Sequence, residues 1–201
     1  RKHNLMGSAT TPPCNVAVIG CGYWGQNLVR NFAEMGVLSA VCDNDEKLAT
    51  QHARNHQVMC SSWSDILADK NINAVSIATP AASHGELVRA ALDNGKHVLV
   101  EKPMALHVSQ AEEIAKLAKE GNRTVMVGHL LQYHPAFHAL LCLVNDGELG
   151  KLRYIYSNRL NFGRFRTEEN ILWSFAPHDI SMILSLTGTE PNYVNAVGQS
   201  Y

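Results

Sequence analysis

The stretch Val16–Gly25, VAVIGCGYWG, restricts the possible folds of this chain more than any other. Apolar residues run directly into Gly20, Gly22 and Gly25, and a segment with helical spacing follows. This order predicts a buried strand, a tight turn and a helix. In such a turn, glycines let a phosphate group approach the backbone closely, and the helix N-terminus stabilises its charge. A lone GxGxxG pattern is weak evidence, so the rest of the chain has to decide.

The chain continues with a regular alternation of short apolar runs and helix-period segments up to Gly128. The expected strands are residues 15–20, 37–42, 73–78, 97–101 and 124–128, and the expected helices are residues 24–35, 45–55, 64–69, 82–94 and 108–120. Near-continuous apolar strands such as NAVSIAT and HVLV indicate burial on both faces, as in a parallel sheet. The alternation therefore predicts a doubly wound α/β domain of the Rossmann type.

An acid follows the second expected strand, in AVCDND, where Asp43 comes 18 residues after Gly25. A carboxylate at this point binds the ribose hydroxyls of a dinucleotide. The acid repels a 2′-phosphate and no arginine follows it directly, so NAD is favoured over NADP as cofactor. Taken alone, Asp43 is equally well explained as the cap of the next helix. Together, the loop, the acid and the α/β rhythm favour dinucleotide binding.

The end of the fifth expected strand carries a second candidate, HVLVEKPMA. Ligands of open α/β sheets bind beyond the carboxyl ends of the strands, so Glu101 and Lys102 are expected to face that crevice. A lysine there can hydrogen-bond a substrate hydroxyl and stabilise negative charge that develops on its oxygen. A surface Lys–Glu pair before a turn proline explains the position equally well.

Composition excludes several classes of function. The 201 residues carry a formal net charge of -1 and are 46% hydrophobic, so neither nucleic acid nor an anionic membrane surface is an expected partner. Apolar runs fall far short of the about 18 residues of a membrane span. Five scattered cysteines without a CxxC pair favour a reducing cytoplasm over a disulfide framework or a zinc site. Cys21, inside the glycine loop, is expected to be a small packing residue rather than a reactive thiol.

The rhythm changes after Gly128. HLLQYHPAFHALLCLVNDGELG indicates a loop and a helix, KLRYIYSNRLNF alternates like an antiparallel strand, PHDISMILSLTG indicates a helix, and NYVNAVGQSY resembles a strand cut off within a sheet. We therefore expect a flexible leader over residues 1–13, a dinucleotide-binding domain over residues 14–129, and an incomplete domain for substrate binding and oligomerisation over residues 130–201. The last is expected to be a partial α+β domain with a mostly antiparallel sheet.

Four segments, VAVIGCGYWG, VCDNDE, ATPAASHGELVRAALDNGKHVLVEKPMA and VGHLLQYHPAF, resemble successive signatures of the Gfo/Idh/MocA oxidoreductase family. The resemblance is close over residues 14–135 and looser to residue 201. It implies an N-terminal Rossmann domain, a C-terminal domain with a large, mostly antiparallel sheet, and NAD(P)-dependent oxidation or reduction of sugars, cyclitols or nucleotide sugars. Members are longer than this chain, so a C-terminally truncated form is expected. The resemblance also implies a homo-oligomeric full-length protein, because the C-terminal sheet usually mediates assembly in this family.

The resemblance also implies where the cofactor is bound. Thr79, Pro80 and His84 would flank the nicotinamide, and Glu101 and Lys102 would lie at the junction of cofactor and substrate. The whole expected cofactor-binding set is Gly20, Gly22, Tyr23, Trp24, Gly25, Asp43, Thr79, Pro80, His84, Glu101 and Lys102.

The second catalytic candidate beside Lys102 is His178. Members of the family commonly carry a D-x-x-x-H pattern whose histidine transfers a proton, and His178 in SFAPHDISMI matches that histidine. Four residues earlier stands Ser174 instead of an aspartate; it could hold a water or a substrate group. Asp179 would point roughly 100° away from His178 on a helix, and capping is as good an explanation for it as orienting. A structural histidine at a helix start is the alternative for His178.

A narrower resemblance links RTEENILWSFAPHDISMIL to a bacterial branch that acts on UDP-linked amino-sugar uronates in polysaccharide pathways. Positive charge is concentrated in a short stretch near His178, at Lys151, Arg153, Arg159, Arg164 and Arg166. Guanidinium groups suit the pyrophosphate or carboxylate of an anionic substrate, and a solvated strand face explains any one of these residues at least as well. The i, i+4 pairs His52/His56 and His134/His138 lack a further convincing ligand, so no metal is expected. We expect an NAD-dependent dehydrogenase; the alternatives are a non-catalytic NAD- or sugar-sensing protein and an inactive fragment.

Overall fold

The computed structural model of the chain describes residues 14–160 and 171–199. The expected leader and two of the basic candidates, Arg164 and Arg166, lie outside the described residues. The chain divides into two compact units, an N-terminal unit of residues 1–128 and a C-terminal unit of residues 129–201.

The N-terminal unit contains a six-stranded sheet in the order β3-β2-β1-β4-β5-β6, in which every neighbouring pair is parallel. Its strands are β1 (Val16–Ile19), β2 (Leu38–Cys42), β3 (Met59–Cys60), β4 (Ala74–Ile77), β5 (His97–Val100) and β6 (Val125–Val127). The strand order reverses between β1 and β4, and a ligand of such a sheet binds outside the carboxyl ends of the strands at this reversal. The Rossmann fold expected from the sequence is confirmed.

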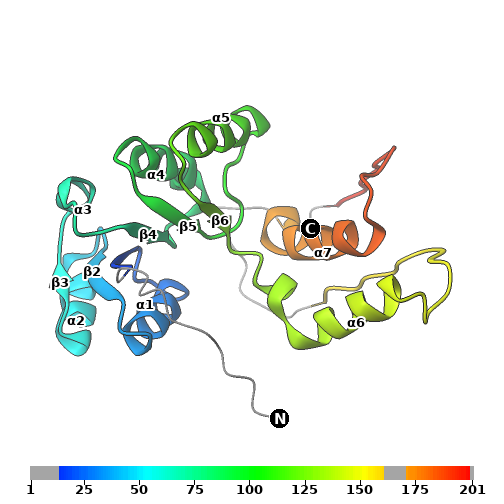
Figure 1. Cartoon of the computed structure of the whole chain (residues 1–201), viewed down its shortest axis with the longest axis horizontal. Coiled ribbons are helices and arrows are strands. Elements are labelled where there is room, and N and C mark those ends of the chain that lie inside the picture. Colours follow the sequence, from blue (N-terminus) through cyan, green and yellow to red (C-terminus); the bar gives the residue numbers. More distant parts are fainter. Residues whose placement is uncertain (1–13, 161–170, 200–201) are drawn as a thin grey trace, which may run out of the picture. The chain divides into compact units, whose positions relative to one another are not determined.

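Helices cover both faces of this sheet (Figure 1). They are α1 (Gly25–Glu34), α2 (Glu46–His56), α3 (Trp63–Ala68), α4 (Ala81–Asp93) and α5 (Val108–Glu120). The side chains of β1 alternate between two apolar clusters: Ala17 and Ile19 belong to the larger one, which includes α4 and α5, and Val18 belongs to the smaller one under α1 and α2. Full burial of a larger aliphatic side chain such as Val18 or Ile19 stabilises the fold by about 1.5–3 kcal/mol.

Local capping fixes where α2 begins. Asp45 Oδ1 accepts the backbone N–H groups of Lys47 and Leu48 at 3.0 and 3.2 Å. Such a cap stabilises a helix by about 1 kcal/mol. At the other end, Gln57 takes the left-handed conformation, with φ 56°, and stops the helix. The turn between β2 and α2 is therefore held in one shape, and Asp43 lies within it.

Strand β3 is an element that the periodicity of the sequence does not predict. It has only two residues, both exposed, and two residues are too few to show an alternation. The other five strands and all five helices of the N-terminal unit lie within one residue of their expected ends. For these elements, the spacing of apolar residues and the capping residues correctly indicated both the type of element and its ends.

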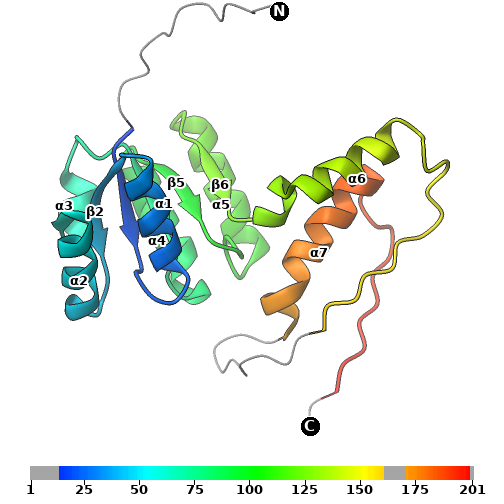
Figure 2. The same cartoon turned by 90° about the horizontal axis from the view of Figure 1, so that it is seen from below.

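The C-terminal unit contains the 3-10 helix η1 (Leu130–Tyr133) and the helices α6 (Pro135–Asn145) and α7 (Ile171–Thr187), which Figure 2 shows from a second side. The helix expected from PHDISMILSLTG forms, but it begins earlier and runs through Pro177. The prediction of strands is wrong for residues 151–160 and 192–199, which form none. A strand needs a hydrogen-bonded neighbour, and the described part of this unit offers none.

Within the two described ranges, no helix is both long and apolar enough to cross a lipid bilayer.

Candidate functional site

Two of the three loop glycines are required by contacts inside the protein. Gly20 has φ +88°, and a Cβ there would lie 2.8–2.9 Å from backbone atoms of Ala78 and Thr79. A Cβ on Gly25 would overlap the carbonyl oxygen of Gly20. The β1–α1 turn therefore packs directly against the segment that follows β4. A side chain at either position would push these backbones apart.

Gly22 is different, because a Cβ there would have no other atom of the chain within 4 Å. Internal packing therefore does not explain a glycine at this position. A bound group that comes close to the loop backbone would explain it, and a pyrophosphate at the N-terminus of α1 is such a group. The loop has the form that a dinucleotide requires.

The carboxylate of Asp43 is held beside this loop. Its Oδ2 accepts the backbone N–H of Cys21 at 2.6 Å, and its Oδ1 accepts the backbone N–H of Asp45 at 2.9 Å. The residue that caps α2 is Asp45, so the capping explanation for Asp43 does not apply. Asp43 instead lies at the carboxyl end of β2 and points toward the glycine loop, where a ribose diol would be bound.

Cys21 is almost fully buried, with 1% of its surface exposed. Burial, reinforced by the negative charge of Asp43, raises the pKa of its thiol to about 12. A thiol with such a pKa is protonated near neutrality and is a poor nucleophile. Cys21 acts as a small packing residue of the turn, as expected.

The glycine loop is also joined to the EKP segment. The indole N–H of Trp24, at the start of α1, donates a hydrogen bond of 2.6 Å to Glu101 Oε1 beyond β5. Burial raises the pKa of Glu101, and the hydrogen bond from Trp24 opposes that rise. A Cβ on Gly128 would lie 3.0 Å from both carboxylate oxygens of Glu101, so this glycine leaves room for the carboxylate.

The residues after β4 lie at the same edge of the sheet. The hydroxyls of Thr79 and Ser83 share a hydrogen bond of 2.7 Å, and Pro80 precedes the first turn of α4. His84 is buried behind them, with 1% of its surface exposed. Its ring nitrogens lie 2.7 Å from the carbonyl oxygens of Pro103 and Thr79.

Backbone hydrogen bonds bring these segments together. Residues just past the strand ends donate to the neighbouring strand, in the pairs Gly20–Cys42, Ala78–Ile19, Glu101–Ile77 and Gly128–Val100, at 2.8–2.9 Å. The structure thus places the expected cofactor-binding residues of the glycine loop, the β2 end, the β4 end and the β5 end along one edge. Lys102 follows Glu101 at this edge. Tyr23, in the same loop, is 82% exposed.

In the C-terminal unit, His178 lies in the interior of α7 rather than at its start. Ser174 precedes it by one helical turn and so lies on the same face. The rings of His178 and His129 meet edge to face, with centroids 6.2 Å apart and an interplanar angle of 86°. Sequence reasoning did not single out His129, although it belongs to the segment VGHLLQYHPAF, directly after Gly128.

Asp179 binds the segment that precedes α7. Arg159 donates from Nε to Oδ2 at 2.6 Å and from Nη2 to Oδ1 at 3.1 Å, and Ser157 donates its hydroxyl to Oδ1 at 3.1 Å. The hydrogen bond from Arg159 lowers the pKa of Asp179 and raises that of Arg159 itself. Asp179 therefore does not cap α7, and Arg159 is already paired with a carboxylate.

Three of the four paired histidines have ring contacts that the structure describes. The rings of His52 and His56 stack with centroids 6.4 Å apart. His134 accepts the backbone N–H of Ala136 and caps α6. In the two described ranges, no group of three or more His, Cys, Asp or Glu side chains lies close enough to hold a metal ion.

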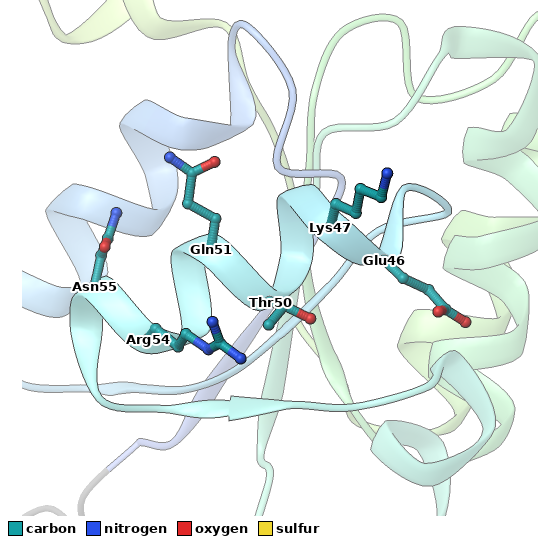
Figure 3. Close-up of a pocket in the computed structure, with 6 residues that line it drawn as sticks. All are labelled: Glu46, Lys47, Thr50, Gln51, Arg54 and Asn55. Atoms are coloured by element: carbon teal, nitrogen blue, oxygen red, sulfur yellow. The ribbon is translucent and has the colours of Figure 1, made fainter.

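Figure 3 shows the residues that line an open depression on α2, which begins directly after the turn that holds Asp43. Its lining consists of Glu46, Lys47, Thr50, Gln51, Arg54 and Asn55. All six come from one helix; one is acidic, two are basic and three are neutral and polar, as is typical of a solvated face. We assign it no role.

Comparison with known proteins also indicates a Rossmann domain that binds a dinucleotide. Residues 14–129 match the Gfo/Idh/MocA model, described as an oxidoreductase family with an NAD-binding Rossmann fold. UDP-N-acetylglucosamine 3-dehydrogenase from Acidithiobacillus ferrooxidans is 30% identical over 185 residues, which are 90% of this chain and 56% of the relative. NAD-dependent scyllo-inositol 2-dehydrogenase from Bacillus subtilis is 29% identical over 143 residues, or 69% of this chain and 42% of the relative.

The solved structure of the Acidithiobacillus ferrooxidans dehydrogenase superposes with a TM-score of 0.84 at 30% identity, covering 93% of this chain and 58% of that one. The chain thus spans about half the length of the curated relatives it matches. The family match covers more than half of the chain and the entire Rossmann sheet. The chain belongs to the Gfo/Idh/MocA family of oxidoreductases with an NAD-binding Rossmann fold.

Proposed function

We propose that the protein is an NAD-dependent oxidoreductase that transfers a hydride between nicotinamide C4 and a hydroxyl-bearing carbon of a sugar or nucleotide sugar. The observation that supports this most is the glycine loop, which is open to an outside group at Gly22 and has the Asp43 carboxylate fixed beside it. NAD, when bound, supplies the hydride acceptor. The residues of the chain bind it, orient it and move the proton.

The choice of NAD over NADP follows from how Asp43 is held. Both of its oxygens accept backbone N–H groups, one from the glycine loop and one from the start of α2. A carboxylate held by two hydrogen bonds cannot easily rotate away to make room for a 2′-phosphate. The negative charges of the carboxylate and of the phosphate would repel each other. The ribose hydroxyls of NAD can donate to the remaining lone pairs.

Lys102 and His178 are the proposed catalytic residues. Lys102 would donate a hydrogen bond to the reacting oxygen and stabilise the negative charge that develops there. His178 would take the hydroxyl proton as the hydride leaves, a role that suits an imidazole near neutral pH. Ser174 stands four residues before His178, where the family pattern D-x-x-x-H has its aspartate, so it would hold a water or a substrate group.

A nucleotide sugar is the proposed substrate class, with a place in polysaccharide biosynthesis. Support comes from the relative that acts on UDP-N-acetylglucosamine. Five free cysteines agree with a reducing cytoplasm as the place of action. A homo-oligomeric full-length protein stays a prediction, which light scattering on that protein would check.

The test is the appearance of NADH absorbance with NAD and a panel of UDP-sugars, including UDP-N-acetylglucosamine and N-acetylated uronates. It is run on this chain and on any longer natural form. We expect turnover in the longer form and its loss on Lys102→Ala. Lys116→Ala, which removes an exposed lysine of α5, serves as the control and should remain active. NAD binding without turnover of any sugar would favour the sensing protein instead.

A further inference from the structure

The ring of His84 lies between two loops of the N-terminal unit. Nδ1 is 2.7 Å from the carbonyl oxygen of Pro103, and Nε2 is 2.7 Å from the carbonyl oxygen of Thr79. Both partners are acceptors only. A neutral imidazole donates from one nitrogen and would set the lone pair of the other against a carbonyl oxygen. Only a ring with a proton on each nitrogen satisfies both contacts, and the side chain is 1% exposed.

The two carbonyl groups belong to segments that the reaction would use. Pro103 directly follows Lys102, and Thr79 lies against the glycine loop, because a Cβ on Gly20 would come within 2.9 Å of the Thr79 nitrogen. The imidazole is rigid. Its two hydrogen bonds therefore fix the spacing between the backbone at Lys102 and the backbone that supports the cofactor loop.

A doubly protonated ring in the interior needs a compensating charge. Glu101, on the same segment as Pro103, provides one. Burial raises the pKa of Glu101, and the positive charge of His84 is one of the influences that lower it again. The carboxylate of Glu101 is thus close enough to His84 at the end of β5 for opposite charges on the two side chains to attract each other.

We propose that His84 is a positioning residue that, through N–H donors on both ring nitrogens, sets Lys102 at a fixed distance from the cofactor loop. This inference rests on the proposed function, since that function gives Lys102 its place at the reacting oxygen. His84 itself does not touch the reacting atoms. Its effect on the rate comes through the backbone of residues 102–103.

Two amide substitutions separate the two hydrogen bonds. The amide nitrogen of His84→Asn reaches the position of Nδ1 and can still donate to Pro103. The amide nitrogen of His84→Gln reaches the position of Nε2 and can still donate to Thr79. We expect the Gln variant to lose kcat by about 10–100-fold with little change in the KM for NAD, because misplacement of a catalytic group by about 1 Å has that effect. The Asn variant should keep most of kcat and instead raise the KM for NAD.

A matched control removes packing from the same helix. Val88, on α4, is fully buried in the apolar core, and Val88→Ala should lower the unfolding temperature without changing kcat or the KM for NAD. If the Asn and Gln variants behave like Val88→Ala, His84 is only a core residue and the proposal is overturned.

Two measurements need no turnover. In the 15N-histidine NMR spectrum of the wild-type chain, both ring nitrogens of His84 should carry a proton; a neutral ring would contradict the proposal. Backbone amides of residues 101, 102 and 104–106 should exchange hydrogen faster in the Gln variant than in the Asn variant, and equal exchange would also contradict it. If the longer natural form turns over no sugar, the proposed function fails, while these two measurements still decide the role of His84.

Discussion

At the scale of single residues, the glycine loop separates what folding needs from what binding needs. Gly20 and Gly25 are surrounded by backbone atoms of the chain, whereas nothing of the chain would meet a side chain at Gly22. Gly20 and Gly25 are therefore required by packing within the protein, whereas Gly22 is explained by the approach of a bound group. The difference can be measured, because an alanine at Gly22 should affect mainly the affinity for NAD and an alanine at Gly25 should affect the stability of the fold.

We predict that Gly22→Ala changes the free energy of unfolding by less than about 0.5 kcal/mol, as for substitutions that meet no contact. Its affinity for NAD should fall severalfold or more, because the methyl group occupies the space that the pyrophosphate needs. Gly25→Ala should instead lower the free energy of unfolding by about 1–3 kcal/mol through overpacking. Urea unfolding and NAD titration of both variants check this. A Gly22→Ala protein that binds NAD like the wild type would show that the loop does not hold the cofactor.

At the scale of elements, the ion pair between Asp179 and Arg159 ties residues 151–160 to α7. Arg159 holds the pKa of Asp179 below its ordinary value. A lowered carboxyl pKa means that the stabilisation is fully present above the pKa of the unfolded chain and is lost as the pH falls through the folded-state pKa. The ion pair therefore stabilises the C-terminal unit at neutral pH, and this stabilisation is lost at acid pH when Asp179 becomes protonated.

We predict that Asp179→Asn lowers the free energy of unfolding at neutral pH by about 1 kcal/mol and makes it less dependent on pH on the acid side. The measurement is a series of urea unfolding curves from neutral to acid pH for both proteins. The control is Asp146→Asn, which changes a carboxylate at the end of α6. Among the described residues, Asp146 takes part in no ion pair. A variant curve parallel to that of the wild type would refute the assigned role of the pair.

Elements that depend on local pattern were predictable, and elements that depend on partners were not. The run VAVI and the cap at Asp45 specify β1 and α2 without reference to the rest of the chain. Residues 151–160 alternate like a strand, yet they form none because the described part of the C-terminal unit offers no strand to pair with. Met35 continues the apolar spacing of α1 but ends the helix and is 68% exposed.

The candidate site shows the same division. The sequence placed Gly22, Asp43 and Glu101 at one edge of a parallel sheet, since that follows from strand order alone. It did not predict that Trp24 bonds Glu101, 77 residues away, or that both nitrogens of His84 are used inside the protein. Such contacts depend on side-chain directions in the folded chain, which spacing does not contain.

At the scale of the whole molecule, the six-stranded sheet, both apolar clusters and the entire expected cofactor-binding set lie within residues 14–128. We predict that this segment, produced alone, folds cooperatively and binds NAD with an affinity close to that of the whole chain. Thermal unfolding followed by circular dichroism and NAD titration test this. It should show no dehydrogenase activity, because His178 lies outside it. A segment that folds but does not bind NAD would mean that the C-terminal unit contributes to the cofactor site.

The absence of neighbouring atoms around Gly22 allows a genetic experiment in which cofactor binding is changed without changing the fold. If the proposed function holds, a strain whose only change is an alanine codon at this position should make the polypeptide in normal amounts and with normal lifetime, but without the proposed NAD-dependent activity. A gene deletion removes both at once. Comparing the two strains would tell a geneticist which traits come from the reaction and which from the mere presence of the protein.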